Sequence, residues 1–562
     1  MKRVSELLMT SRPSRSLAEI LPGSASLRTL FAALAVAWGG STVHARDMSR
    51  AAAVSGTSAA LDGLRDNGAA LRSFLVEMPK GGDLHNHLAG AVYAESALAW
   101  ARAEGWCFDV ASKAALPPPC DAASKPPLAE ALRSTQAYRD AINAWSMRDV
   151  ANSRVSGHDQ FFNSFFRFSD VTGNNVGGAL AEVVERAASQ NVLYLELMIG
   201  PLMGEARDLG ERIGWKDDPD AMLAALDGKG LGDLVKRAAE SVVAVVADKD
   251  RRLACSDSAH RRPGCNVAVR FLAQVYRNVD RAKLFAQTAL AARLASLDGP
   301  VVGLNLVAAE DDEITLGNYS EQMRIVGDVG RRHPKARISL HAGELTMGLV
   351  PPKDLTFHIR EAVEVAGARR IGHGVDIGFE RDAKSLMARM ARDGIMVEIN
   401  LTSNAQILGV EGADHPFPLY RNAGVPTALS TDDEGVSRID LTHEYQRAAR
   451  VYQLSYRDLK QLSRNSLTYA FLPGESLWRD PAAARPISVC INAQFGGPSP
   501  SAECRRFLAG SEKARLQWEL ETRFARFEST WSGREAKPAN SVALASPPWS
   551  SAKRERSSRG VR

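Results

Sequence analysis

Short runs of consecutive apolar residues recur along the chain between positions 83 and 433. From the third run onward they are separated by stretches with helical spacing, such as RAKLFAQTALAARLASL. Buried apolar strands that alternate with helices are typical of a parallel sheet. The eight runs are DLHNHL (83–88), VLYLELMI (192–199), VAVRFLAQVY (267–276), VVGLNLVA (301–308), ARISLHAG (336–343), RIGHGVDI (370–377), IMVEINLTS (395–403) and PTALSTDD (426–433). Eight such units predict a closed (β/α)₈ barrel of the TIM type. A doubly wound open sheet is the alternative, but no G-x-G-x-x-G follows the first run.

Several segments lie outside this repeat. Two interrupt it with Pro-rich or Gly-rich stretches, and we expect them to be loop insertions in the barrel. A C-terminal extension follows the barrel, and its last part is rich in Ser, Pro, Ala and Arg, a composition typical of disorder. The predicted organisation is an N-terminal segment (46–75), a barrel (76–480) with insertions near 101–135 and 201–265, an appendage (481–531) and a disordered basic tail (532–562).

The first 45 residues resemble an export signal. Basic residues precede the apolar run LFAALAVAW (30–38), and STVHA then offers small residues at Val43 and Ala45 for cleavage. The alternative is a membrane anchor, but the run is short for a transmembrane helix. We therefore predict a signal peptide over 1–45, a periplasmic or secreted protein and no stable membrane insertion.

The six cysteines fall into three local pairs without C-x-x-C spacing. A thiolate zinc site is therefore disfavoured, whereas an exported chain permits disulfides. We predict that each pair closes a short loop, with free buried thiols as the alternative. The pairs are Cys107 with Cys120, Cys255 with Cys265, and Cys490 with Cys504.

The formal net charge of +5 is concentrated at the two ends of the chain. Both 1–45 and 534–562 are basic, and the body between them is weakly acidic. A nucleic-acid-binding protein requires a basic face on its folded body. The charge pattern therefore predicts no nucleic-acid partner.

Polar residues gather at the predicted strand ends, where a (β/α)₈ barrel carries its active site. His85 and His87 lie two residues apart on the first strand and so face the same side. The fifth strand ends in HAGE (341–344), the sixth contains GHG with His373, and the eighth ends in STDD (430–433). Buried polar groups in this number are costly unless they pair with one another or bind a metal.

A single Zn²⁺ ion explains this set. Three imidazoles and one carboxylate are suitable zinc ligands, supplied here by His85, His87, His341 and Asp432. A water on the metal would have its pKa lowered to about 7 and give hydroxide at neutral pH. Glu344, His373 and Asp433 then remain for proton transfer and for contact with the substrate.

Five motifs, in order, resemble the adenosine deaminase family of metal-dependent aminohydrolases, especially its secreted growth-factor-like branch and bacterial relatives. They are MPKGGDLHNHLAGAV, SLHAGE, RIGHGVDI, EINLTSN and LSTDDEGV, and the resemblance spans about residues 76–475. It implies one zinc per chain and a small-molecule purine nucleoside as substrate. It also implies attack of zinc-bound hydroxide at purine C6, which converts adenosine or deoxyadenosine to inosine or deoxyinosine and ammonia.

The resemblance also implies a role for each residue. The three histidines at 85, 87 and 341, with Asp432, match the zinc ligands, and His87 and Asp432 also lie beside the reacting atoms. Glu344 matches the acid that protonates purine N1, which fits the need to activate an aromatic ring before attack. His373 matches the residue that orients the attacking water. Asp433 matches the group near purine N7, and Ala308 the backbone N–H near N3.

Two positions depart from the family pattern. Ala89 stands where familiar nucleoside deaminases have an Asp that contacts the ribose 5′-hydroxyl, and Ala308 stands where they have Gly. Metal chemistry is therefore better supported than ribose recognition. The alternatives are a related barrel amidohydrolase acting on another purine or amine, and a secreted binding protein on a deaminase scaffold.

Three further points stay open. Glu196 and Glu310 either line the pocket or bond neighbouring loops, whereas we expect Asn404 to hold a loop through side-chain to backbone bonds. The insertions form either a lid or a contact between two subunits, which leaves a homodimer open.

Overall fold

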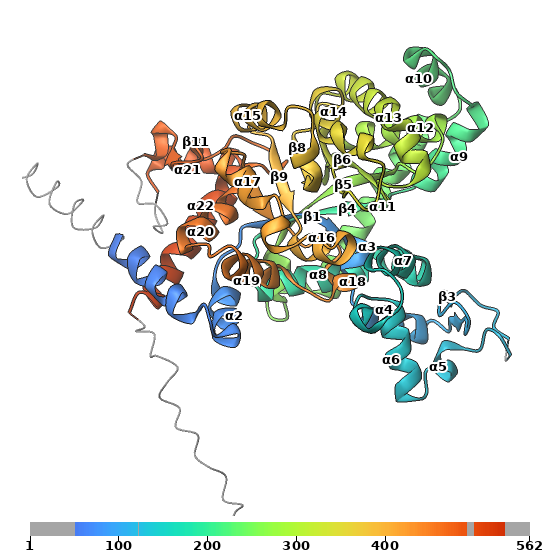
Figure 1. The fold of residues 1–562 in the computed structure, drawn as a ribbon, viewed down its shortest axis with the longest axis horizontal. Coiled ribbons are helices and arrows are strands. Elements are labelled where there is room, and N and C mark those ends of the chain that lie inside the picture. The colour runs from blue at the N-terminus through green and yellow to red at the C-terminus, as the bar shows by residue number, and fades with distance from the viewer. Residues whose placement is uncertain (1–50, 122, 492–499, 534–562) are drawn as a thin grey trace, which may run out of the picture.

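Eight parallel strands form the centre of the molecule (Figure 1). The computed structural model describes residues 51–121, 123–491 and 500–533. The sheet order is β1-β4-β5-β6-β7-β8-β9-β10, so neighbours in the sheet follow one another along the chain. The strands are β1 (Gly82–His87), β4 (Tyr194–Ile199), β5 (Ala268–Tyr276), β6 (Val301–Val307), β7 (Arg337–Ala342), β8 (Arg370–His373), β9 (Met396–Ile399) and β10 (Thr427–Leu429). Each of the eight predicted runs coincides with one of them, although β1 begins one residue before its run.

Backbone hydrogen bonds between β1 and the residues after β10 close the sheet. Asn86 and Asp432 form a parallel bridge. In it, the N–H of His87 donates to the carbonyl of Asp432 at 2.9 Å and the N–H of Asp432 donates to the carbonyl of His85 at 2.8 Å. The predicted (β/α)₈ barrel is therefore confirmed. The bridge also places two candidate ligand segments side by side.

Helices surround the barrel because each βα unit must bury the outer, apolar face of its strand. Helix α12 is typical: Asp280 caps its first turn by accepting from Ala282 and Lys283, and its small apolar side chains pack against β5 and β6. The helices of the barrel region are α3 (Leu88–Ala91), α4 (Ala94–Ala103), α7 (Gly157–Asn174), α8 (Val176–Ser189), α12 (Arg281–Ala295), α13 (Glu313–Arg332), α14 (His358–Glu364), α15 (Ala383–Asp393), α16 (Leu401–Leu408), α17 (Phe417–Asn422), α18 (Glu434–Ser437), α19 (Leu441–Val451) and α20 (Tyr456–Thr468).

The segments outside the repeat carry their own short elements and all six cysteines. Segment 101–135 holds the small hairpin β2 (Cys107–Phe108) and β3 (Ala115–Leu116) and helix α5 (Leu128–Ala131), followed by α6 (Thr135–Ala144). Segment 201–265 holds α9 (Met203–Ile213), α10 (Pro219–Asp227) and α11 (Leu231–Arg252). The three predicted disulfides form: Cys107–Cys120, Cys255–Cys265 and Cys490–Cys504.

The two ends of the described chain meet on one side of the barrel (Figure 1). Phe74 of α2 (Gly68–Glu77) packs edge to face on Phe527 and Trp531 of α22 (Glu512–Trp531), with ring centroids 5.0 and 4.8 Å apart. The C-terminal part also contains the hairpin β11 (Trp478–Asp480) and β12 (Arg485–Pro486), and α21 (Ala502–Gly510). The predicted signal peptide and nearly all of the predicted tail lie outside the described residues. Among the described residues, no helix is long and apolar enough to cross a membrane.

Candidate active site

The candidate metal ligands lie together at the carboxyl ends of the strands. His85 and His87 come from β1, His341 from β7, and Asp432 from the segment after β10. His85, His341 and Asp432 are buried, and the His87 side chain is 12% exposed. Distant parts of the sequence therefore meet because all parallel strands end at the same rim of the barrel.

Four potential ligand atoms converge. His341 Nε2 lies 3.1 Å from His85 Nε2 and 3.2 Å from His87 Nε2. Asp432 Oδ1 lies 3.2 Å from His85 Nε2 and 3.3 Å from His87 Nε2. A tetrahedral ion bound at about 2.0 to 2.1 Å requires ligand atoms about 3.3 Å apart. Three imidazole nitrogens and one carboxylate oxygen at this spacing fit Zn²⁺ in both geometry and chemistry.

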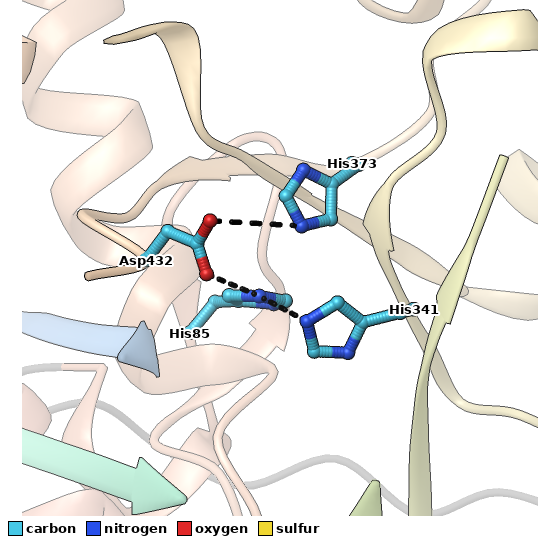
Figure 2. Close-up of side chains that lie close together, drawn as sticks. All are labelled: His85, His341, His373 and Asp432. Atoms are coloured by element: carbon cyan, nitrogen blue, oxygen red, sulfur yellow. Dashed lines mark hydrogen bonds and ion pairs between the residues drawn. The ribbon is translucent and has the colours of Figure 1, made fainter. Parts of the chain in front are cut away.

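His373 lies at the edge of the same cluster, as Figure 2 shows. Its Nε2 is 4.0 Å from Asp432 Oδ2, which is longer than the contacts of His87 with the other ligand atoms. His87 therefore completes the more compact ligand set. His373 is left beside that set, in a place where a side chain could contact a water on the metal.

Two of the imidazoles are oriented by buried acceptors that the sequence reasoning missed. His85 Nδ1 lies 2.7 Å from Glu398 Oε2, and His341 Nδ1 lies 2.9 Å from Asn305 Oδ1. An acceptor at Nδ1 holds the ring proton there and leaves the Nε2 lone pair free for a metal. Both acceptors lie within predicted strands. A buried Glu or Asn has no packing role there, so its presence is the signal by which the sequence could have identified these residues.

The other two ligand residues also have polar supports. The side-chain amide of Gln274, on β5, lies 2.7 Å from His87 Nδ1, and its oxygen can accept the ring proton once the amide is turned towards it. Ser403 Oγ donates to Asp432 Oδ2 at 2.7 Å, so Asp432 can present its other oxygen to the metal. Neither residue stood out in the sequence.

Glu344 is held at the rim by the loop that contains it. Glu310 accepts hydrogen bonds from the backbone N–H groups of Gly343 and Glu344 at 3.1 and 2.9 Å, which fixes the HAGE turn. Burial, followed by the nearby charge of Asp432, raises the pKa of Glu344 well above its usual value. The side chain is thus suited to carry a proton near neutral pH. Its Oε1 lies 3.5 Å from His373 Nδ1.

His373 is fixed by side chains rather than by backbone. Asn404 Nδ2 lies 2.8 Å from His373 Nδ1, and Asn404 Oδ1 lies 3.0 Å from His415 Nε2. The expectation that Asn404 bonds to backbone is wrong, because its amide is aimed at two imidazole rings. Burial lowers the pKa of His373 to about 3, so the ring is neutral at pH 7.

Three residues at the rim have a left-handed backbone: Ala308 at φ 82°, His373 at φ 68° and Asp432 at φ 61°. Non-glycine residues rarely adopt this conformation, at a cost of about 1 to 3 kcal/mol each. The same conformation turns the chain sharply where a strand ends. Glycine adopts this conformation without that cost, which accounts for the glycine of the family pattern at position 308.

Asp433 is buried behind the ligand Asp432. A Cβ on Gly90 would come within 1.7 Å of Asp433 Oδ1, so the glycine makes room for this carboxyl group. Among the described residues, Asp433 Oδ1 has no hydrogen-bond partner. Burial and the adjacent Asp432 raise the pKa of Asp433 well above its usual value. A buried polar atom without a partner is available to a substrate.

Glu196 and Glu310, left open by the sequence, both bond neighbouring segments. Besides the HAGE turn, Glu310 contacts His358 Nδ1 at 2.6 Å. Glu196 accepts from Tyr194 Oη at 2.5 Å and from the N–H of Phe471 at 2.8 Å.

Comparison with known proteins agrees with this geometry. The family model described as "Adenosine deaminase" matches residues 154–478, more than half of the chain. An adenosine deaminase of Clostridium perfringens is 23% identical over 408 residues, which cover 71% of this chain and 96% of that protein. An adenosine deaminase of Erwinia tasmaniensis is 37% identical over a shorter stretch of 140 residues, 25% of this chain and 39% of that one.

A solved structure supports the fold. An amidohydrolase of Burkholderia ambifaria, crystallised with bound Zn, is 18% identical and superposes with a TM-score of 0.50 over 83% of this chain and 96% of its own. The family match covers the strands that carry His341 and His373 and the segment that carries Asp432, and it begins after His85 and His87. This chain therefore belongs to the adenosine deaminase family and is a purine aminohydrolase, a hydrolase acting on carbon–nitrogen bonds.

Proposed function

We propose that the protein is a zinc-dependent enzyme that hydrolyses adenosine or deoxyadenosine to inosine or deoxyinosine and ammonia. The observation that supports this most strongly is the set of four candidate ligand atoms, His85, His87 and His341 Nε2 with Asp432 Oδ1, in which four of the six separations are 3.1 to 3.3 Å. A metal in such a site acidifies a bound water, so that a nucleophile is available at neutral pH. The other steps fall to side chains of this protein.

Glu344 is the proposed proton donor to purine N1. An aromatic purine ring resists attack at C6 until a ring nitrogen is protonated, because that nitrogen must take up the electron pair displaced by the attacking oxygen. Burial favours the protonated form of the Glu344 carboxyl, and the hydrogen bond from its backbone N–H to Glu310 holds this turn in place. The proton that His373 receives from the water would then pass to the leaving amine, and the Glu344 carboxylate would recover its own proton from the C6 hydroxyl as the carbonyl of the product forms.

His373 is the proposed base that orients the attacking water and receives its proton. Its buried, neutral ring is held by Asn404 and lies between Glu344 and Asp432. Asp433, with its unpaired buried Oδ1, is proposed to contact purine N7, and the N–H of Ala308 to contact N3. Together these contacts would place C6 over the metal site.

The proposed location is outside the cytoplasm. Three disulfides are typical of oxidising compartments, where glutathione does not keep thiols reduced. A cytoplasmic protein of this size would rarely retain them.

The test is the change in ultraviolet absorbance when zinc-loaded protein is mixed separately with adenosine, deoxyadenosine, adenine and AMP. We expect a change with the two nucleosides and ammonia released in equal amount. A response to adenine or AMP alone would contradict the nucleoside assignment and leave the metal chemistry intact. No response to any of the four, in protein shown to contain zinc, would overturn the proposed reaction.

A further inference from the structure

A cleft lies at the opposite end of the barrel from the candidate active site. Its volume is about 620 Å³. It is bounded by the starts of β6 and β7, by the chain just before β8 and β9, and by α22 with the segment that follows α20. Since the catalytic rim is at the carboxyl ends of the strands, this cavity shares no residue with that site.

Basic side chains dominate the charge of this cleft. Lys335, Arg337, Arg369 and Lys513 line it, together with a single acidic residue, Asp298. Lys335 approaches Asp298 only at 3.9 Å, and both of these side chains are largely exposed. Within the described ranges of the chain, no carboxylate lies within 4.0 Å of the charged groups of Arg337, Arg369 or Lys513.

Two other carboxylates near the cleft are paired with arginines outside its lining. Asp393 is paired with Arg392 at 2.9 Å and with Arg389 at 3.5 Å. Glu196, below the floor of the cleft, forms an ion pair with the buried Arg370. The positive charge around the cleft is therefore only partly balanced by carboxylates of the described residues.

Lys513 illustrates the effect of this positive charge on one residue that lines the cleft. Its ammonium donates to the carbonyl of Thr468 at 3.2 Å and is half-buried. Burial, partly offset by Glu196 and reinforced by Arg370 and Arg337, lowers the pKa of Lys513 to about 8. A half-buried amine that faces other cations across a cavity is costly unless an anion joins them.

We propose that this cleft binds a small molecule that carries more than one phosphate group. Arginine forks and lysine ammonium groups are the side chains that recognise phosphate oxygens. Four cations line one cleft, which favours several phosphate groups over one. A cleft of about 620 Å³ has the size of a small-molecule site, whereas a nucleic acid needs a basic face that extends along its backbone. The site is independent of the catalytic proposal, because it lies at the other end of the barrel.

The test is calorimetric titration of the zinc-loaded, full-length protein with pyrophosphate and with fructose 1,6-bisphosphate. Fructose serves as the uncharged control, and zinc content is measured after each titration to exclude chelation. The cleft variants are R337Q/K513M and R337Q/R369Q, the second of which leaves the half-buried Lys513 in place. The matched control is R324Q/K384Q, which removes the same charge from exposed positions that do not line the cleft.

We expect one equivalent of at least one phosphate probe to bind, with affinity lowered about tenfold or more in both cleft variants and unchanged in the control. Equal affinity in all variants, or binding of neither probe, would overturn the proposal. Tighter binding of a single-stranded oligonucleotide than of either probe would also overturn it, in favour of a nucleic-acid surface. Because the readout is binding, each of these results is independent of whether the enzyme deaminates adenosine.

Discussion

Glu398 Oε2 lies 2.7 Å from Nδ1 of His85, and both side chains are fully buried. The other oxygen of Glu398 accepts from Arg370 Nε at 2.6 Å and from Ser339 Oγ at 3.0 Å. Arg370 in turn pairs with Glu196. A continuous chain of buried charges therefore runs along the barrel interior and ends at a proposed metal ligand.

The first prediction concerns this chain. Glu398→Gln should weaken zinc binding by about 10- to 100-fold, because the ring proton of His85 is no longer held by a carboxylate. The measurement is zinc affinity by competition with a chelator. Exposed Glu411→Gln is the control. Unchanged zinc affinity in the Glu398 variant would show that His85 is oriented by packing alone.

Glu344→Gln should leave zinc content unchanged and lower kcat by about 10² to 10⁴-fold, the usual contribution of a general acid. The isosteric amide preserves the shape of the side chain but cannot supply the proton. The measurements are zinc analysis and steady-state kinetics with adenosine. Glu313→Gln, on the exposed first turn of α13, is the control. Full turnover in the Glu344 variant would remove this residue as the acid.

The adjacent carboxylates Asp432 and Asp433 should differ in their effects. Asp432→Ala should lose zinc and activity together, since it removes one of four ligand atoms. Asp433→Ala should keep zinc and act on substrate binding, with KM raised by about tenfold for loss of one buried hydrogen bond. Full zinc occupancy with retained activity in Asp432→Ala would contradict the ligand assignment.

Stability should fall between about pH 6.5 and pH 4, in part because of His415. Burial lowers the pKa of this histidine to about 4, so the unfolded chain binds a proton in this range that the folded chain does not. As the pH falls, the state that binds more protons is stabilised. Here that is the unfolded state, so the folded protein loses stability. The contribution of one such group is up to about 3 kcal/mol.

His415→Gln should therefore flatten the dependence of unfolding free energy on pH across this interval. Denaturant titrations at about pH 7 and about pH 5 measure it. His260→Gln, at a side chain that is 77% exposed, is the control. An equally steep loss of stability in both variants would assign the effect to other groups.

All six cysteines should be oxidised in the native protein. Thiol titration of the denatured, unreduced chain should detect no free thiol, because each pair is bonded within a short loop. Removing Cys107 and Cys120 together should cost up to about 3 kcal/mol, the entropy of closing a loop of this size. Two or more free thiols in the native preparation would contradict the pairing.

The apolar runs alone predicted eight strands, their order and the closed barrel. A buried parallel strand needs apolar residues on both faces, so its signal is local and repeats with each βα unit. The signal for the cysteine pairs is equally local, because the two members of each pair lie close together in the sequence. Their members lie 10, 13 and 14 residues apart, close enough for spacing to indicate partners.

The sequence also determined which residue types could bind a metal, since His85, His87, His341 and Asp432 follow from their places at strand ends. It did not determine what orients them. Glu398, Asn305 and Gln274 come from three other strands, and their contacts with the histidines depend on barrel closure and on side-chain direction. The basic cleft has the same origin, because Arg337, Arg369 and Lys513 meet only when α22 packs across the barrel end. Local patterns are encoded within a few residues, whereas contacts between distant segments exist only once the chain has folded.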